Sequence, residues 1–228
     1  MVRASRPGEQ FQSVLANISC GDVFDRRSAI EQIALSCRSN PGSRCPQALS
    51  ALSKQLTDEA HRALAACAAS ALGGVLALNA DGRRRPAAGA AGSAHEPTDE
   101  EDAALSALVR ALQHGYDGVR VAAACALGKA CLRHKPATAA LLKIVEHDGS
   151  WQARRAAVGG LPSVCTFDDA AAVSATLNRI LASQSEPYDE VRHTCGQRAA
   201  WHARVWRVCG ISTTVAHKVR KSCHMQAR

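Results

Sequence analysis

A run of small residues from Asp117 to Gly128, Asp-Gly-Val-Arg-Val-Ala-Ala-Ala-Cys-Ala-Leu-Gly, constrains the fold of this chain most strongly. Asp117 can accept the first backbone N–H bonds of a helix. Ala122, Ala123, Ala126 and Leu127 then form a thin apolar stripe at helical spacing. One short helix with such a narrow stripe cannot bury it alone, so the run predicts neighbouring helices that pack closely against it.

The same pattern recurs along the chain when the register is fixed on Arg120. Arg154 opens the next copy, and the segment 189–192, Asp-Glu-Val-Arg, opens another after a slightly longer interval. Backward along the chain, Arg62 and Arg27 open similar helices at nearly the same spacing. The gap between Arg62 and Arg120 is too long by about twenty positions, which indicates an insertion. A period in the mid-thirties with two helices per unit is typical of an α-solenoid.

The pattern Asp-x-Val-Arg-x-Ala-Ala-x-x-Ala-Leu-Gly at 117–128 resembles the second helix of a HEAT repeat. The alanine-rich form is similar to the short repeats of phycobilisome-lyase-type HEAT proteins. This resemblance extends over residues 8–200. It implies an all-α, armadillo-like helical fold, a right-handed superhelix of about five HEAT-like hairpins. No β-branched run alternates with period two, so no sheet is expected.

Four segments follow from this pattern. Residues 8–78 are predicted to hold repeats 1–2, and residues 102–200 are predicted to hold repeats 3–5. Between them, residues 79–101 are poor in bulky apolar side chains and rich in Arg, Ala and Gly, which is typical of a loop. Residues 201–228 form a basic extension. Helices are expected at about 8–19, 25–38, 46–56, 58–78, 102–114, 118–132, 136–147, 150–161 and 168–183, with a last one starting near 189.

The net charge of +8 originates at one end of the chain. Eight of the 28 Lys and Arg residues lie in 191–228, and none of the 20 Asp and Glu residues does. Aromatic and basic residues are mixed in the segment 201–207, Trp-His-Ala-Arg-Val-Trp-Arg. Such a segment could bind phosphate groups or acidic proteins. It could equally be a helix that caps the array with a polar face, or an altered C-terminus.

The cysteines and the apolar segments favour a reduced, water-soluble environment. Ten cysteines are present without a Cys-x-x-Cys spacing, and Cys67 and Cys125 share one register position, where we expect a buried packing role. No stretch reaches the roughly 18 apolar residues of a membrane span, and the first residues lack the apolar segment of a secretory signal. A cytoplasmic or nuclear location is therefore expected.

The aligned arginines are the most regular polar feature. The resemblance implies that Arg27, Arg62, Arg120, Arg154 and Arg192 bond to acids or carbonyls of the adjacent repeat. Alternatively, they form a basic stripe on the concave face, which the second helices would line. The residues predicted to bind a partner on that face are Arg26, Arg27, Arg120, Trp151, Arg154, Arg155 and Arg192.

Motifs for catalysis are missing from the sequence. It contains no Gly-rich phosphate loop and no Gly-x-Ser-x-Gly elbow, and its only His-Glu pair, at 95–96, falls in the expected loop. We therefore expect no enzyme activity, no cofactor and no metal. The predicted function is a scaffold that binds a protein partner on its concave face. The alternative is binding of nucleic acid or another polyanion through the concave-face arginines and the basic tail.

Overall fold

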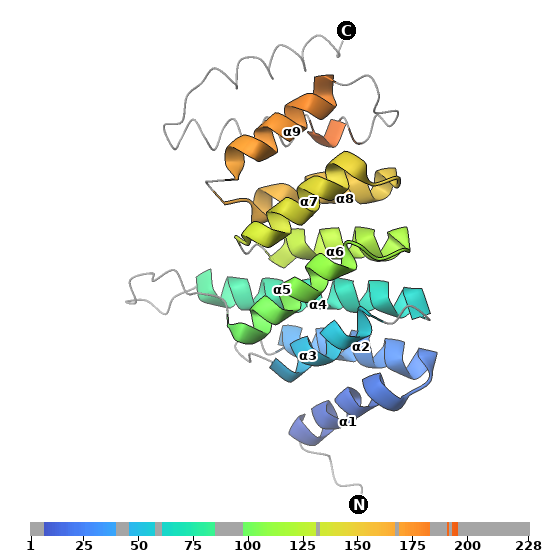
Figure 1. Cartoon of the computed structure of the whole chain (residues 1–228). Helices are drawn as coiled ribbons and strands as arrows, with labels where there is room; N and C mark the ends of the chain where they lie inside the picture. The colour runs from blue at the N-terminus through green and yellow to red at the C-terminus, as the bar shows by residue number, and fades with distance from the viewer. Residues whose placement is uncertain are drawn as a thin grey trace, which may run out of the picture. The chain divides into compact units, whose positions relative to one another are not determined.

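The computed structural model describes residues 7–39, 46–57, 61–84, 98–130, 133–166, 169–182, 191 and 193–195. These residues form α-helices and their connections and include no strand, so the predicted all-α class is confirmed. The helices are α1 (Pro7–Cys20), α2 (Val23–Ser39), α3 (Pro46–Gln55), α4 (Arg62–Arg84), α5 (Asp99–Ala111), α6 (Asp117–Ala130), α7 (Lys135–His147), α8 (Trp151–Val164) and α9 (Ala170–Ala182) (Figure 1). They belong to two compact units, Met1–Leu132 and Arg133–Arg228.

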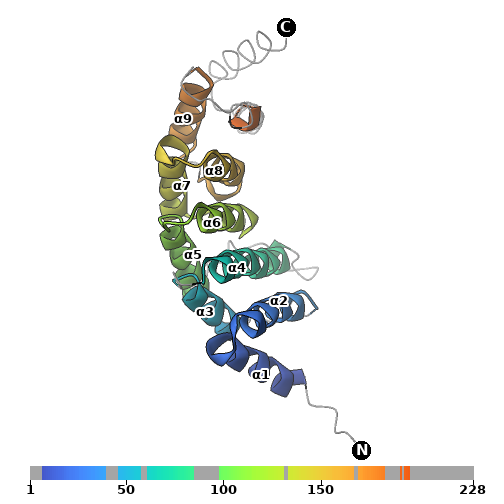
Figure 2. The same ribbon diagram turned by 90° about the vertical axis from the view of Figure 1, so that its right-hand side faces the viewer.

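The first unit consists of three helical hairpins. Within each hairpin the two helices pack together: α1 on α2, α3 on α4 and α5 on α6. Successive hairpins also meet through equivalent helices, because α4 contacts both α2 and α6, and α3 contacts both α1 and α5. The second helices of these hairpins therefore form one layer, with α3 and α5 in the other (Figure 2).

The packing of α4 against α6 depends on Gly73. A Cβ atom placed on Gly73 would lie 2.5 Å from Cα of Ala126 and 3.0 Å from its carbonyl oxygen. Such a short separation is possible only because Gly73 has no side chain and Ala126 has a small one. The small residues that the repeat pattern selects thus determine how closely these two helices approach.

The second unit contains α7, α8 and α9, and α7 packs against the other two (Figure 2). His134 caps α7, since its Nδ1 accepts a hydrogen bond from the N–H of Ala137 at 3.2 Å. The N–H of His134 and the hydroxyl of Thr138 both donate to the carbonyl oxygen of Val164, at 3.1 and 3.3 Å. These bonds join the start of α7 to the end of α8 and close the hairpin.

Two helices run further than their sequences predict. Helix α4 continues to Arg84, so the beginning of the expected 79–101 loop is helical. Asn79 bonds to Glu101 and Ala80 is buried, so tertiary contacts outweigh the local Asn-Ala-Asp-Gly turn signal. Helix α8 passes through Pro162 to the fully buried Val164, whereas the sequence predicts an end near residue 161, before this proline.

Helix α5 begins with a capping box built on a buried carboxylate. Glu101 is 1% exposed; its Oε2 accepts from the N–H of Thr98 at 3.1 Å, and its Oε1 accepts from Nδ2 of Asn79 at 3.0 Å. The hydroxyl of Thr98 accepts from the N–H of Glu101 in return, at 3.4 Å. The acidic run 99–102 therefore does more than complement the helix dipole, because one member ties α5 to α4.

One helix in the described part of the chain, over Arg62–Ala80, has the length and hydropathy of a membrane span. The sequence had led us to expect no such segment. The core helix of a soluble protein passes the same test, and 56% of this segment is buried within the structure. Helix α4 packs on α2, α3, α5 and α6.

Candidate functional site

Two of the aligned arginines hold the turns of their own hairpins. Arg120 Nη1 donates to the carbonyl oxygens of His114, at 2.9 Å, and Gly115, at 3.2 Å. Arg154 Nη1 donates to the carbonyl oxygen of Asp148 at 2.6 Å. In both cases the acceptor lies in the turn before the arginine's own helix. Both arginines thus bond to carbonyls of their own hairpin, whereas the resemblance implied bonds to the adjacent repeat.

The helices that carry these arginines bury the same positions. Counted from Arg120, α6 buries positions −1, +3, +4, +6, +7 and +10, and α8 buries the same six positions counted from Arg154. Arg154 itself is only 9% exposed, whereas Arg120 is half-buried. The two helices are thus built on one pattern, and its period is the spacing of Arg120 and Arg154, as the sequence predicted.

The same pattern corrects the register in the first two hairpins. In α2 the buried residues Ala29, Ile30 and Ile33 lie at +3, +4 and +7 from Arg26, so Arg26 and not Arg27 takes the repeat position. Arg26 Nη2 donates to Oε1 of Gln55, which ties α2 to α3. Arg27 is exposed and pairs with Glu31 on the same helix, at 3.2 Å.

In α4, the residue at the repeat position is not an arginine. The buried residues Leu64, Ala68, Ala69, Ala71, Leu72 and Val75 lie at −1, +3, +4, +6, +7 and +10 from Ala65. Arg62 lies nearly one turn earlier, on the exposed side, with its guanidinium carbon 5.8 Å from the ring centre of Tyr116. A one-letter match at the start of a helix therefore could not establish the register there, whereas the burial pattern does.

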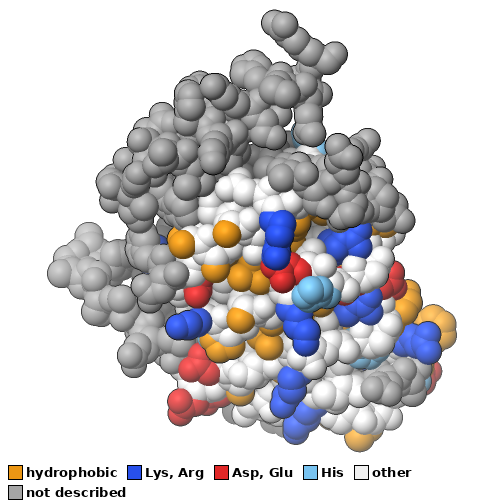
Figure 3. All heavy atoms as spheres, turned by 45° about the horizontal axis from the view of Figure 1, so that its top comes forward, with side chains coloured by type: hydrophobic (Ala, Val, Ile, Leu, Met, Phe, Trp, Pro, Cys, Tyr) orange, Lys and Arg blue, Asp and Glu red, His pale blue; other side chains and the backbone are white. Residues whose placement is uncertain are grey.

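The remaining candidates differ in exposure. Arg155 is exposed, and Trp151 is half-buried at the first residue of α8. Arg192 lies outside the described residues, as does most of the acid-free segment 191–228. On the face shown in Figure 3, basic side chains are interspersed with acidic, histidine and apolar ones. The structure therefore brings Arg26, Arg120 and Arg154 into contacts within the protein and leaves Arg27 and Arg155 on the surface.

The outward side of the second helices carries mostly small side chains. Positions −2, +2, +5 and +9 from the repeat position fall on this side. The residues are Ala63, Cys67, Ser70 and Gly74 in α4, Gly118, Ala122, Cys125 and Lys129 in α6, and Gln152, Ala156, Gly159 and Ser163 in α8. All of them are exposed or half-buried. Cys125 is exposed, so the prediction that it packs in the core is wrong.

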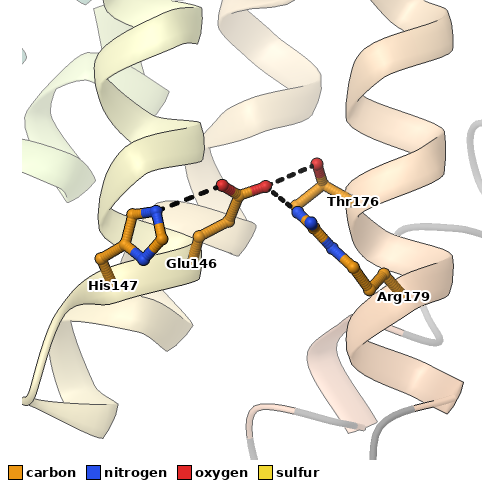
Figure 4. A network of polar contacts seen from close by, with 4 residues as sticks. All are labelled: Glu146, His147, Thr176 and Arg179. Atoms are coloured by element: carbon orange, nitrogen blue, oxygen red, sulfur yellow. Dashed lines mark hydrogen bonds and ion pairs between the residues drawn. The ribbon is translucent and has the colours of Figure 1, made fainter.

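A polar cluster joins α7 to α9 in the second unit (Figure 4). Oε1 of Glu146 accepts from the hydroxyl of Thr176 at 3.1 Å and from Nη2 of Arg179. Oε2 of Glu146 lies 3.6 Å from Nε2 of His147, whose side chain is 71% exposed. Glu146 thus connects α7 to α9, and His147 lies beside its carboxylate. Among the residues that the structure describes, no three His, Cys, Asp or Glu side chains are grouped as metal ligands.

One thiol in the second unit has a shifted pKa. Burial raises the pKa of Cys165 from 9.0 to about 11, and the nearby Asp169 carboxylate adds to the rise, while Arg133 opposes it. Its Sγ lies 3.1 Å from the carbonyl oxygen of Thr166. A thiol with a raised pKa remains protonated at neutral pH, so Cys165 is not an activated nucleophile.

No known family model matches this chain, and a search of curated proteins finds no match either.

Proposed function

We propose that this chain is a non-catalytic scaffold, an α-solenoid of about five HEAT-like hairpins that binds a protein partner on one face. The observation that supports this most directly is the shared pattern of α6 and α8, with the same buried positions and the same bond from arginine to turn. Proteins built from such units stack them to bury their apolar faces, which leaves a long, rigid surface for a partner.

The binding face would be the outward side of the second helices, which would become the concave side of the solenoid. Its small side chains, such as Ser70 and Cys125, let a partner approach the helix backbones closely. Of the residues predicted to contact the partner, Arg27 and Arg155 are exposed and Trp151 is half-buried. Arg26, Arg120 and Arg154 would instead support the surface from behind, through their bonds to Gln55 and to the turns.

Blocking substitutions test the location of the face. Ser70→Glu places a large charged side chain on the outward side of α4, and Ser106→Glu makes the same change at an exposed position of α5, a first helix. Partners captured from cells by the wild-type chain should be lost with Ser70→Glu and retained with Ser106→Glu. Equal capture by both variants, with circular dichroism unchanged, would place the binding site elsewhere.

The alternative function, binding of nucleic acid or another polyanion, is favoured by one observation. The segment 191–228 carries eight Lys and Arg and no Asp or Glu. Binding through several cations weakens steeply as salt rises, because counterions are released from the phosphates. Fluorescent duplex DNA and single-stranded RNA should therefore be titrated with the full chain and with residues 1–190 at two salt concentrations. Salt-sensitive binding that disappears on truncation would favour the tail as a nucleic-acid arm, and no binding by the full chain would exclude this alternative.

The proposed location is the cytoplasm or the nucleus. It rests on the free thiols among the described cysteines and on the coverage of the apolar helix α4 by its neighbours. Fluorescence microscopy of the tagged chain tests it, and a reticular or surface pattern would contradict it.

A further inference from the structure

The outward side of α2 differs from that of the other second helices because it is apolar at both ends. Phe24 is 83% exposed and Leu35 is 57% exposed. Their separation in the sequence is close to three full turns, so they lie on one line along the helix with Ser28 and Glu31 between them. The buried residues Ile30 and Ile33 lie on the opposite side. Two large apolar side chains thus remain exposed on one line of this helix.

The residues along this line are placed symmetrically about its centre. Phe24 and Leu35 are equidistant from the midpoint between Ala29 and Ile30, and so are Ser28 and Glu31. If a second α2 lies antiparallel on the first, with a twofold axis at this midpoint, Phe24 meets Leu35 of the second copy at both ends. Ser28 then faces Glu31 of the second copy, where its hydroxyl can donate to the carboxylate. The small Ser28 leaves room for two helix axes at an ordinary packing distance of about 8–10 Å.

The charges beside the line are also self-complementary. Arg38, in the last turn of α2, would lie beside Asp22 of the second copy, just before its α2, and both side chains are exposed. Arg27 and Glu31 already pair on the same helix and add no net charge. A twofold interface requires a surface that complements itself, and opposite charges beyond two apolar contacts meet that requirement.

We propose that α2 is a homodimerisation surface, in which two copies of this chain pack their α2 helices antiparallel through Phe24 and Leu35. The contact consists of one pair of helices, so it buries less surface area than a standard interface, which buries about 1,200–2,000 Å². Self-association is therefore weak, with a dissociation constant in the micromolar range or above. This dimer does not depend on the proposed scaffold function, since α2 would pair whether or not the other helices bind a partner.

Sedimentation velocity of the full chain from about 2 µM to about 200 µM, a range that brackets a weak interface, tests the proposal. The variants Phe24→Glu and Leu35→Glu place a carboxylate at each apolar contact, and Leu35→Gln makes the milder change. Val23→Ser is the matched control, because Val23 is 42% exposed on the same helix but lies about 100° away from the line. Far-UV circular dichroism at each concentration confirms that the helices of every variant are retained.

The wild-type chain and Val23→Ser should show the same rise of sedimentation coefficient with concentration. The Glu variants should raise the dissociation constant of the dimer at least about tenfold, which corresponds to a loss of about 1.4 kcal/mol or more. Leu35→Gln should raise it by less. A wild-type chain that remains monomeric throughout would overturn the proposal. Dimers that persist in both Glu variants would also overturn it, because another surface would then form them. If a different protein captured from cells binds α2 and no dimer of this chain forms, the surface serves that protein and the homodimer is refuted.

Discussion

Two adjacent glycines in α4 should respond to alanine substitution in opposite directions. In the interior of a helix, Gly→Ala stabilises by about 1 kcal/mol, because alanine loses less backbone freedom on folding. Gly73 and Gly74 lie in the same helix and share this gain. They differ in what the added methyl group meets, so the pair isolates the effect of helix packing from that of helix propensity.

At Gly73 the new Cβ would lie 2.5 Å from Cα of Ala126, 2.6 Å from its Cβ and 3.0 Å from its carbonyl oxygen. Carbon atoms in ordinary contact are about 3.5–4.0 Å apart, so α4 and α6 must separate by about 1 Å or more. Overpacking of this kind costs about 1–3 kcal/mol, and the obstacle here is backbone, which cannot rotate away. After the propensity gain of about 1 kcal/mol is subtracted, Gly73→Ala should destabilise the fold by up to about 2 kcal/mol.

At Gly74 the added methyl group meets no atom within 4 Å, so only the propensity gain remains. Gly74→Ala should therefore stabilise by about 0.5–1 kcal/mol. Urea unfolding followed by circular dichroism measures both variants against the wild-type chain, with the midpoint as the quantity compared. If Gly73→Ala raises the midpoint as much as Gly74→Ala does, the close approach of α4 and α6 is not as tight as the structure has it, and the reasoning fails.

Four further results are expected from the contacts described above. Arg154→Met should lower the free energy of unfolding by about 1.5–3 kcal/mol, because a largely buried guanidinium that binds the Asp148 carbonyl is lost. The control Arg155→Met, at the neighbouring exposed position, should change the free energy of unfolding by less than about 0.5 kcal/mol. Equal losses of the two variants in urea unfolding would contradict the role of Arg154. Glu101→Gln should cost about 1–2 kcal/mol, since the neutral amide is a weaker acceptor for Thr98 and Asn79; an unchanged thermal midpoint would show that the capping box is dispensable. At pH 9 the Cys165 thiol should be alkylated by iodoacetamide more slowly than the exposed Cys125, as peptide mass spectrometry can follow, and comparable rates would contradict its raised pKa of about 11. The Cys165 thiol ionises at a lower pH in the unfolded chain than in the folded chain. Its contribution to the free energy of unfolding should therefore be complete below about pH 9 and be lost as the pH rises to about 11. Cys165→Ala should remove this pH dependence.

The helices were largely predictable because their signals are local. The apolar spacing of α6 and Asp117 at its start, for example, lie within a few turns of the chain. The predicted helices match the described helices α1 to α9, most of them to within a turn at each end. The largest difference is the end of α4, where the contact of Asn79 with Glu101 comes from a residue 22 positions away. No local pattern could have revealed that partner.

The candidate site was predictable only in part, for the same reason. The repeat spacing in the sequence related Arg120 to Arg154 correctly, since both helices keep the same small residues after the arginine. It failed for Arg27 and Arg62, because neighbouring residues look alike in sequence while only one of them faces the core. Similarly, the position of Cys125 on the solvent side depends on which side of α6 the other helices cover.

The sequence by itself determined that this chain is helical and that its helices recur, because hydrophobic period and small-residue content are properties of short segments. The tertiary structure alone decided which arginines bind turns, which glycine allows two helices to touch and which apolar residues of α2 remain exposed. Each of these depends on atoms that are distant in the chain and meet only after packing. Burial, not residue type, therefore assigns the role of each side chain here.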